Sequence, residues 1–570
     1  MKLSHKFRTL VVAMILLAGL GGVIVRLFFL QVLWHDFFFE KASRQQRFSL
    51  TLPPKRGKIL DRKGRDLAIS VPIKSFYVVP SEIKDMAKTV TALAKIFSLN
   101  QKDIYKKIAK KKNFIWIKRK VDKGEASACL ALKLKGVYFI EETKRIYPGG
   151  KLLSHVLGFT GLDDKGLEGL ELQFNKYLKG KPGWKLSERD ATGREVLTPL
   201  KFEVRPEDGF NLVLTIDAGI QTLVESQLDQ VMEEFDAQSA TAVVIEPQSG
   251  EILALANRPA YDLNEVSKYP SSVRRNRAIT DFFEPGSTLK PVVVSAALQE
   301  KLVKLSDRFY CENGVFSIPG GHLLHDVHPY GVLSVEDIVV KSSNIGMAKI
   351  GCRLGAHQLY HYLKKFGFGN ETGIDLPGEI SGWLHPLSQW SKLTPYMVPM
   401  GQEITVTAVQ LARAYCALAN QGVLVRPHLI RQIVDTEGNS ILQAKTQGKE
   451  QVLSQEAVNQ IVQAMKGVVS EDGTGYNAQV EGYSVAGKTG TAQKVVEGGK
   501  YSHSKFVSSF VGFLPADHPQ AVVLVVVNEP QHFHYGGTVA APAFKEIAGD
   551  LMRYLEVPPD QMLAKKEKTE

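Results

Sequence analysis

A serine and a lysine one helical turn apart form the first candidate catalytic pair of the sequence. Ser287 follows a Pro-Gly turn in the stretch DFFEPGSTLKP and begins an expected helix over residues 287–302, and Lys290 comes three residues later in that helix. A serine hydroxyl becomes a strong nucleophile only when a neighbouring base removes its proton, and a neutral lysine can serve as that base. Serine is also a common helix N-cap and lysine a common helix-surface residue, so the pair alone leaves both interpretations open.

Two further motifs lie downstream of this pair. VKSSNIGMAKIG holds Ser342 and Asn344 at a break between two helical patterns, and VAGKTGTAQK holds Lys488 in a strand-like stretch. The order Ser-x-x-Lys, Ser-x-Asn and Lys-Thr-Gly is the signature of penicillin-binding proteins and serine β-lactamases. Any one motif is weak evidence, but the three together, each in its expected context, predict a serine acyl-transfer site.

The five residues of these motifs can carry out the steps of acyl transfer from a peptide. We expect Ser287 to be the nucleophile and Lys290 to take its proton. Burial beside a second cation, Lys488, would lower the pKa of Lys290 far enough for that role. Ser342 can relay a proton to the leaving amine, while Asn344 can hold Lys290 and the substrate backbone.

The strand-like motif also offers substrate-binding groups. Thr489, together with the lysine before it, can bind the carboxylate at the end of the substrate. The amides of Ser287 and Thr491 are the expected oxyanion donors, because the developing negative charge needs two preorganised N–H groups. Gly487 and Gly490 are expected to let the substrate backbone approach the strand closely.

The flanking sequence predicts the elements that position these motifs. Residues 206–217 indicate a Pro/Gly turn and a strand, and a helix is expected from about Ala218. Residues 239–259 predict a hairpin of two apolar strands, and residues 521–528 (AVVLVVVN) predict a central strand buried on both faces. Strands at both ends with helices between them predict one sheet whose halves are far apart in the sequence.

The N-terminus predicts a membrane anchor. Residues 10–25 are uncharged and apolar, Arg26 interrupts, and residues 27–34 continue a run that exceeds the roughly 20 residues needed to span a bilayer. Lys2, Lys6 and Arg8 precede the run, so the positive-inside rule places the N-terminus in the cytoplasm and the chain after about residue 40 outside it. The alternative is a cleaved signal peptide, but no small-x-small cleavage site follows the run.

Longer strings extend the match nearly end to end. They are RGKILDRKGRDLA, RIYPGG, GFTG with GLEGLE, RNRAITDFFEPGSTLKP, KSSN, GFGNETGIDLPGE, EDGTG, GKTGTAQK and GGTVAAPAF. On these strings the chain resembles the class B penicillin-binding proteins. The resemblance implies an α+β chain with a single N-terminal transmembrane helix, a mixed α/β non-catalytic pedestal of the dimerisation type and a transpeptidase domain. That last domain is expected to hold a five-stranded antiparallel sheet flanked by helices.

The expected domains follow from this resemblance and from the sequence pattern. They are a cytoplasmic N-terminus (1–9), a transmembrane anchor (10–34), the pedestal (40–210), the transpeptidase domain (211–555) and a flexible charged tail (556–570). The implied activity is that of a peptidoglycan D,D-transpeptidase, which cross-links stem peptides through a serine acyl-enzyme and is acylated by β-lactams. Its implied location is the cytoplasmic (inner) membrane, with the catalytic domain extracytoplasmic or periplasmic.

Within the family, the stretches GFTGLDDKGLEGLE and RAITDFFEPGST resemble the septal, division-specific (FtsI-like) branch. The elongation-type branch is the alternative, because Gly401-Gln402-Glu403 departs from the glycine-tyrosine-glycine loop common in septal enzymes. No glycosyltransferase domain precedes the pedestal. Polymerisation of lipid-linked glycan strands is therefore expected to need a partner glycosyltransferase, beside other division proteins.

Two other functional classes share these motifs. A membrane-anchored β-lactamase or D,D-carboxypeptidase would use the same serine, with a base-held water that releases the acyl group. The other class is a catalytically silent scaffold or β-lactam sensor, and a sensor would usually carry more transmembrane or cytoplasmic signalling sequence. The intact motifs, together with the anchor and the pedestal, favour the transpeptidase.

Composition narrows the remaining possibilities. The chain has 570 residues, 44% of them hydrophobic, and a formal net charge of +12, which suits a protein beside anionic lipid or an anionic polymer. The basic stretch 110–120 carries no nucleic-acid motif, so no nucleic-acid partner is expected.

No cofactor or metal site is expected, since His532 and His534 in HFHYGG are typical of a loop. Cys352 and Cys416 are expected to be buried thiols, because both lie in apolar helical patterns.

Overall fold

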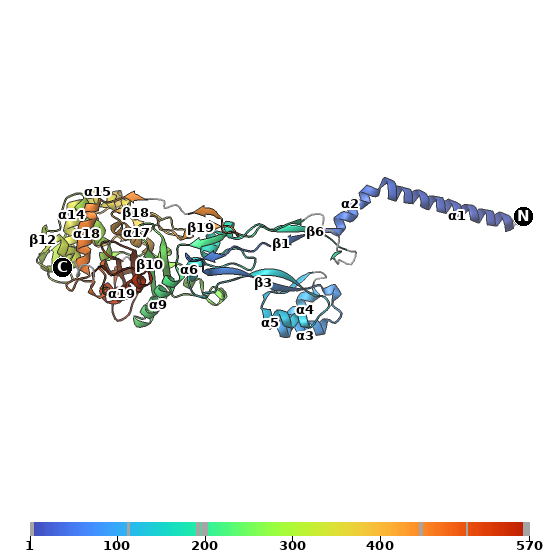
Figure 1. The fold of residues 1–570 in the computed structure, drawn as a ribbon, viewed down its shortest axis with the longest axis horizontal. Helices are drawn as coiled ribbons and strands as arrows, with labels where there is room; N and C mark the ends of the chain where they lie inside the picture. The colour runs from blue at the N-terminus through green and yellow to red at the C-terminus, as the bar shows by residue number, and fades with distance from the viewer. Residues whose placement is uncertain are drawn as a thin grey trace. The chain divides into compact units, whose positions relative to one another are not determined.

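The computed structural model describes residues 5–110, 114–189, 195–196, 203–443, 449–496 and 500–561 (Figure 1). Contacts divide the chain into two compact units, one made of residues 1–55 and 180–208 and the other of residues 56–179 and 209–570. The expected domain boundaries, at residues 10, 40, 211 and 556, stay predictions. Lys2 and most of the expected charged tail lie outside the described residues.

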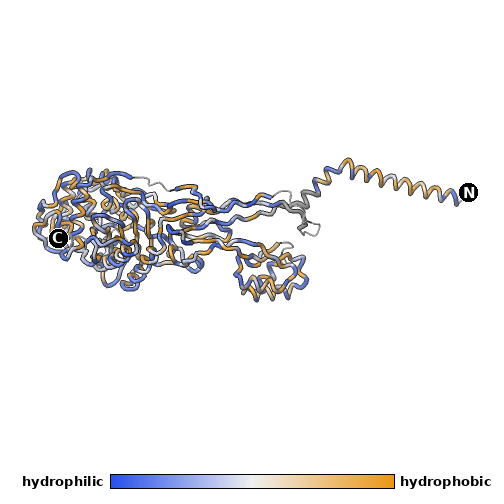
Figure 2. Tube along the Cα trace, viewed as in Figure 1, coloured by the Kyte–Doolittle hydropathy of each residue, from blue (hydrophilic) through white to orange (hydrophobic). Residues whose placement is uncertain are grey.

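The first unit contains the expected anchor. Helix α1 (His5–Phe28) continues through a π-helical turn (Phe29–Leu33) and is followed by α2 (His35–Gln46). The segment His5–Leu33 is 29 residues long and apolar enough to cross a membrane, and Figure 2 shows α1 as hydrophobic along most of its length. The guanidinium of Arg26, the charge that interrupts the apolar run, lies 5.4 Å from the ring centre of Trp34.

A small antiparallel sheet completes the first unit. Strand β6 pairs with each of the other three strands, so backbone hydrogen bonds join residues 183–189 to residues 47–52, 195–196 and 203–204. The four strands are β1 (Arg47–Leu52), β6 (Gly183–Arg189), β7 (Glu195–Val196) and β8 (Glu203–Val204).

The second unit contains a five-stranded antiparallel sheet in the order β11-β10-β24-β23-β22. The predicted hairpin and the predicted central strand are both present, and residues 521–527 of β24 are buried. The sheet joins strands from the two ends of this part of the sequence, as expected. Its strands are β10 (Ser239–Ile245), β11 (Ile252–Arg258), β22 (Ala486–Val496), β23 (Lys500–Leu514) and β24 (Ala521–Asn528).

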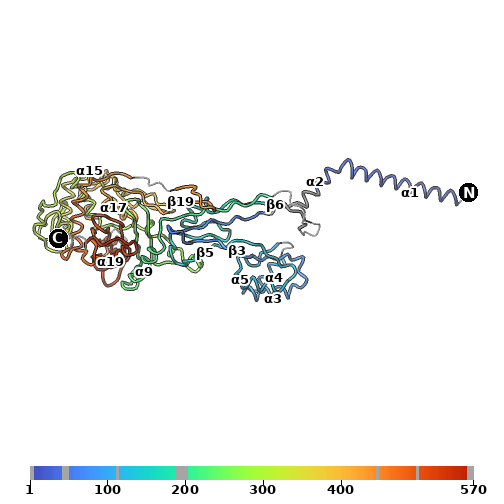
Figure 3. Tube along the Cα trace, viewed as in Figure 1, coloured from blue at the N-terminus to red at the C-terminus, as the bar shows by residue number. Residues whose placement is uncertain are grey.

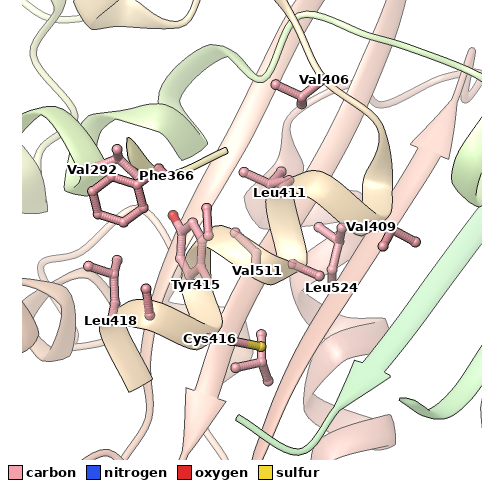
Figure 4. Close-up of a cluster of buried hydrophobic side chains, with 14 of the residues drawn as sticks. Val292, Phe366, Val406, Val409, Leu411, Tyr415, Cys416, Leu418, Val511 and Leu524 are labelled. Atoms are coloured by element: carbon pink, nitrogen blue, oxygen red, sulfur yellow. The ribbon is translucent and has the colours of Figure 1, made fainter. Parts of the chain in front are cut away.

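Helices cover both faces of this sheet. Successive residues of a strand point to opposite faces, so an apolar strand presents apolar side chains on both faces, and both must be buried. Val244 of β10 joins the core under α9 and α19, whereas Val243 joins the larger core under α12, α17 and α18. Figure 4 shows Leu411 and Tyr415 of α17 beside Val511 of β23. The helices are α9 (Ala218–Glu234), α12 (Lys290–Gln299), α17 (Ala408–Ala419), α18 (Gln455–Val468) and α19 (Gly536–Tyr554).

A seven-stranded sheet links the two sequence segments of the second unit. Its order is β20-β19-β9-β2-β3-β4, with β5 also paired to β3, and the pair β2–β9 is the parallel one. Segments far apart in the sequence, such as β3 and β19, therefore lie in one sheet (Figure 3). The strands are β2 (Ile59–Leu60), β3 (Asp66–Val78), β4 (Ile115–Val121), β5 (Val137–Ile146), β9 (Asn211–Leu214), β19 (Ile430–Val434) and β20 (Ser440–Gln443).

Shorter elements fill the rest of the second unit. Helices α3 (Met86–Phe97), α4 (Gln101–Ala109) and α5 (Lys123–Ala131) share a separate small core with β3 and β4. The other helices are α6 (Ser154–Leu157), α7 (Gly169–Gln173), α8 (Asn175–Leu178), α10 (Ser271–Arg274), α11 (Arg277–Thr280), α13 (Val335–Val340), α14 (Asn344–Leu354), α15 (Ala356–Lys365) and α16 (Thr394–Met397). The remaining strands form two-stranded pairs: β12 (Arg308–Tyr310) with β15 (Val332–Ser334), β13 (Val315–Ser317) with β14 (Leu323–His325), β16 (Trp383–Leu384) with β17 (Ile404–Thr405), and β18 (Val423–Leu424) with β21 (Glu450–Gln451).

Candidate active site

Ser287 lies in a tight turn in front of α12. The sequence predicted a helix from Ser287, whereas the structure has a 3₁₀ turn over Gly286–Leu289 and the α-helix begins at Lys290. Pro291 sits in the first turn of that helix, where its missing N–H leaves no intrahelical bond unmade. Ser287 is partly exposed and lines a cavity of about 1390 Å³, so its hydroxyl is accessible to a ligand.

Hydrogen bonds hold the nucleophile turn from two sides. The amide of Gly286 donates to the carbonyl oxygen of Gly401 at 3.1 Å. The hydroxyl of Tyr415, which is fully buried on α17, donates to the carbonyl oxygen of Thr288 at 2.8 Å. The turn therefore rests on the larger core, which gives Ser287 a fixed position.

Lys290 places its amine at the meeting point of two motifs. Its side chain is completely buried, and Nζ lies 2.6 Å from the carbonyl oxygen and 3.2 Å from Oγ of Ser342, and 2.9 Å from Oδ1 of Asn344. Burial lowers the pKa of Lys290 to about 7, and the negative charge of Asp326 opposes that shift. Near neutral pH a large fraction of this amine is therefore unprotonated.

Ser342 lies between two buried lysines. The amine of Lys488 donates to Oγ of Ser342 at 3.0 Å, so this hydroxyl contacts both Lys488 and Lys290. Ser342 has a φ of 60°, a left-handed conformation that is uncommon for a residue other than glycine and is held by the loop between α13 and α14. The three motifs thus converge on one hydroxyl group.

Burial is the main cause that lowers the pKa of both lysines. Repulsion between the two amines adds to it, and together they hold the pKa of Lys488 well below its usual range. The sequence analysis expected both causes, and in the structure burial is the larger one.

The Lys-Thr-Gly motif lies on β22, next to the nucleophile turn. The hydroxyl groups of Thr489 and Thr474 are 3.0 Å apart, and Oγ1 of Thr491 accepts the amide N–H of Gly536 at 3.0 Å. A Cβ at Gly490 would lie 2.4 Å from a side-chain atom of the neighbouring strand β23 and 2.8 Å from one of the nucleophile turn. Glycine at this position therefore lets β22 pack against the turn, which is a different reason from the substrate approach expected from the sequence.

Gly487 is explained by packing too, because a Cβ there would lie 2.6 Å from the ring of Phe510. Phe510 is fully buried on β23 and belongs to the core under α19. Both glycines of the motif thus set the spacing between β22 and its neighbours.

Asp326 is a site residue that the sequence analysis missed. Its carboxylate accepts the hydroxyl proton of Ser343 at 2.6 Å, the amide N–H of Ile345 at 3.1 Å and the amide N–H of Asn344. These bonds satisfy free amides at the start of α14 and fix the Ser-x-Asn loop. Asp326 lies sixteen positions before Ser342 in an irregular stretch, and no periodic pattern there indicates its role.

Residues of all three motifs line the same 1390 Å³ cavity. They are Ser287, Ser342, Asn344, Thr489 and Thr491. His534 also lines it and stacks on Phe506 with 4.1 Å between ring centres. Among the described residues, no group of three or more His, Cys, Asp or Glu side chains is arranged to hold a metal ion.

The cysteines differ in part from expectation. Cys416 is buried in α17, as predicted, but Cys352 is exposed on α14, because it lies on the face of the helix that the core does not cover. Cys129, Cys311, Cys352 and Cys416 are all free thiols.

Comparison with known proteins identifies the family to which these three motifs belong. Residues 240–549 match the penicillin binding protein transpeptidase domain, and residues 51–214 match the penicillin-binding protein dimerisation domain. Stage V sporulation protein D of Bacillus subtilis is 38% identical over 95% of this chain and 85% of that protein. Peptidoglycan D,D-transpeptidase FtsI of Escherichia coli is 34% identical over 96% of this chain and 92% of that protein.

Solved structures agree with this fold. The crystal structure of penicillin binding protein 3 from Mycobacterium tuberculosis, complexed with aztreonam, has a TM-score of 0.71 and 28% identity. That alignment covers 90% of this chain and 98% of the crystallised one. The chain belongs to the class B penicillin-binding proteins and is a peptidoglycan D,D-transpeptidase, an enzyme of the serine acyltransferase type.

Proposed function

We propose that the chain cross-links peptidoglycan stem peptides through an acyl-enzyme on Ser287, during septal wall synthesis. The observation that supports this mechanism most directly is the position of the Ser342 hydroxyl, which lies within hydrogen-bond distance of both Lys290 and Lys488. Two amines on one hydroxyl form a route along which a proton can move between the nucleophile and a leaving group.

In the proposed acylation step, Lys290 accepts the proton of the Ser287 hydroxyl. The Ser287 oxygen forms a bond to the carbonyl carbon of the substrate while the peptide C–N bond breaks. The proton on Lys290 passes through the Ser342 hydroxyl to the departing amine. Lys488 and Thr489 bind the terminal carboxylate, Asn344 positions Lys290 and the substrate backbone, and Gly490 lets the strand pack at the nucleophile turn.

The developing oxyanion is assigned to two backbone donors, the amides of Ser287 and Thr491. The Ser287 amide lies in the turn that leads into α12, where the positive end of the helix dipole favours negative charge. The Thr491 amide lies on β22, the strand that packs against this turn.

The apolar helix α1 and the relatives support a proposal for the wider setting of the enzyme. We assign α1 to the inner membrane with the N-terminus in the cytoplasm and residues 211–555, the transpeptidase domain, on the other side. Residues 40–210 are assigned as the pedestal, and a partner glycosyltransferase would supply the glycan strands. A role in elongation is the alternative. Depletion of the protein from growing cells separates the two, since loss of a septal enzyme gives filaments and loss of an elongation enzyme gives rounded cells.

The nucleophile is tested by incubating the purified full-length chain with a fluorescent penicillin and measuring intact mass, for wild type and Ser287→Ala. We expect a long-lived adduct on the wild type and none on the variant. Rapid turnover of the penicillin without an adduct would indicate a β-lactamase or D,D-carboxypeptidase. No reaction by the folded wild type would contradict the mechanism and favour a silent scaffold.

A further inference from the structure

A carboxylate three residues before the nucleophile lies at the junction of three cavities. Glu284 lines the 1390 Å³ cavity that also holds Ser287, and it lines two adjoining cavities of about 350 Å³ and 380 Å³. No other residue is shared by all three linings. Glu284 is therefore placed where a molecule entering beside the nucleophile would pass.

Only one of the two carboxylate oxygens of Glu284 has a hydrogen-bond partner. Oε1 accepts the amide N–H of Glu403 at 2.9 Å and the hydroxyl of Tyr501 at 3.1 Å. Oε2 is buried and has no partner among the described residues. A buried acceptor without a donor is costly, so this oxygen is suited to accept a hydrogen bond from a ligand.

The backbone around Glu284 is fixed. The preceding residue, Phe283, forms two backbone hydrogen bonds with Val406, one in each direction, at 3.0 Å and 2.9 Å. On the other side the nucleophile turn is held by Gly401, as described above. The carboxylate of Glu284 therefore has a fixed position where the three cavities meet.

The local charge favours a cationic ligand. The pKa of Glu284 is raised, first by burial of the carboxylate and also by the charge of Glu403. The hydrogen bonds from the Glu403 amide and the Tyr501 hydroxyl lower it in part. Arg275, Arg277 and Lys494 line the 350 Å³ cavity with it, but among the described residues none forms an ion pair with Glu284; Arg275 pairs with Asp281, and Lys494 pairs with Glu529. A partly buried carboxylate that no cation neutralises attracts an ammonium group, and a raised pKa makes it a better proton acceptor.

We propose that Glu284 binds the amine of the acyl acceptor. This inference rests on the proposed transpeptidase function, in which a second substrate must bring an amine to the acyl-enzyme. At neutral pH that amine arrives as an ammonium ion, for which a carboxylate beside the nucleophile is the matching group. The donor peptide, whose end is a carboxylate, is instead suited to Lys488 and Thr489.

The proton balance of the second half-reaction is complete with Glu284 in this role. The ammonium gives one proton to the Glu284 carboxylate, which becomes the neutral acid. The free amine then forms the new C–N bond while the ester bond to Oγ of Ser287 breaks. A second N–H proton goes to Oγ, which regenerates the serine hydroxyl, and the carboxyl proton of Glu284 is released to solvent.

The test separates acyl transfer to an amine from the steps that precede it. The full-length chain is acylated by a D-alanyl thioester donor, with D-alanine as the amine acceptor and methanol as a neutral one. Products of aminolysis, methanolysis and hydrolysis are quantified by mass spectrometry. For Glu284→Gln we expect aminolysis to fall roughly tenfold or more relative to hydrolysis, while methanolysis and penicillin acylation change less than about twofold.

A matched control is Glu403→Gln, which removes the neighbouring charge but keeps the backbone N–H that binds Glu284. It is expected to change the ratio of aminolysis to hydrolysis less than about twofold. Glu284→Asp keeps the charge and is expected to retain more aminolysis than Glu284→Gln.

Three outcomes would overturn the inference. They are unchanged aminolysis in Glu284→Gln, an equal loss of aminolysis, methanolysis and penicillin acylation, and lower aminolysis in Glu284→Asp than in Glu284→Gln. A wild type that is acylated but transfers to no acceptor would instead contradict the proposed function.

Discussion

At the scale of single residues, burial changes the chemistry of the lysine in the first motif. An exposed lysine is protonated at neutral pH and cannot take a proton from serine. Complete burial of Lys290 costs the charged form its hydration, and the three oxygen atoms around Nζ hold the amine in place. The same burial acts on Lys488, so the site keeps two amines that both resist protonation.

This environment predicts a pH dependence for acylation. The pKa of Lys290 is about 7, and only its neutral form can accept the Ser287 proton. The second-order rate constant for acylation by a fluorescent penicillin should therefore fall roughly tenfold per pH unit below this value and level off above it. The rate constant is measured on the full-length chain between about pH 5.5 and about pH 9, where thermal unfolding confirms that the protein is folded.

Lys290→Arg provides the control for this dependence, because arginine stays protonated throughout that range. We expect it to lose acylation at every pH tested. A rate constant that does not change with pH in the wild type would show that another group accepts the proton.

At the scale of elements, the site depends on how α14 begins. Helix α14 starts at Asn344, and its first amides are bonded to Asp326, which comes from the loop after β14. This loop supplies an anchor for Ser343 as well. The left-handed conformation of Ser342 is thus held by a carboxylate from another element.

Asp326→Asn is expected to lower the acylation rate at its plateau by about tenfold, because the loop loses charge-assisted hydrogen bonds. The pH midpoint should also move to lower pH. The sign follows from the charge: Asp326 raises the pKa of Lys290, so removing its charge lowers that pKa. The readout is the same pH profile of penicillin acylation.

The matched control is Asp337→Asn in the capping box of α13, where Asp337 bonds the amide and the hydroxyl of Ser334. That variant should lose about 1 kcal/mol of stability and keep the midpoint of the wild type. A midpoint that stays in place in Asp326→Asn would exclude Asp326 as a group that tunes Lys290.

At the scale of the whole molecule, the sequence predicts local features better than the contacts between distant segments. The three motifs, the strand at 521–528 and the helix from Ala218 were all predictable, because each depends on residue types within a short window. Asp326 and the free oxygen of Glu284 were not, because their roles depend on which segments the fold brings together. The strand order β11-β10-β24-β23-β22 is a long-range property of the same kind.

A buried ion-pair network in the second unit is another contact between distant segments. Glu171 is fully buried and accepts Nε–H of Arg56 at 2.6 Å and Nε–H of Arg145 at 2.7 Å. Arg56 also donates to the backbone carbonyl oxygen of Glu171, and Arg145 donates to that of Gly57. One carboxylate thus joins the segments that precede β2, end β5 and form α7.

Glu171→Gln is therefore expected to destabilise this part of the chain by about 3–5 kcal/mol, because two buried guanidinium groups lose their common counter-charge. Hydrogen exchange measures the effect segment by segment, and the amides of β2, β3 and β5 should exchange faster than in the wild type.

The exposed pair Lys181–Glu207 provides the comparison, since Glu207→Gln should cost less than about 1 kcal/mol. Penicillin acylation of the folded Glu171→Gln protein should keep the wild-type rate, because the network touches none of the three motifs. Unchanged exchange in β2, β3 and β5 would mean that apolar packing alone holds these segments together.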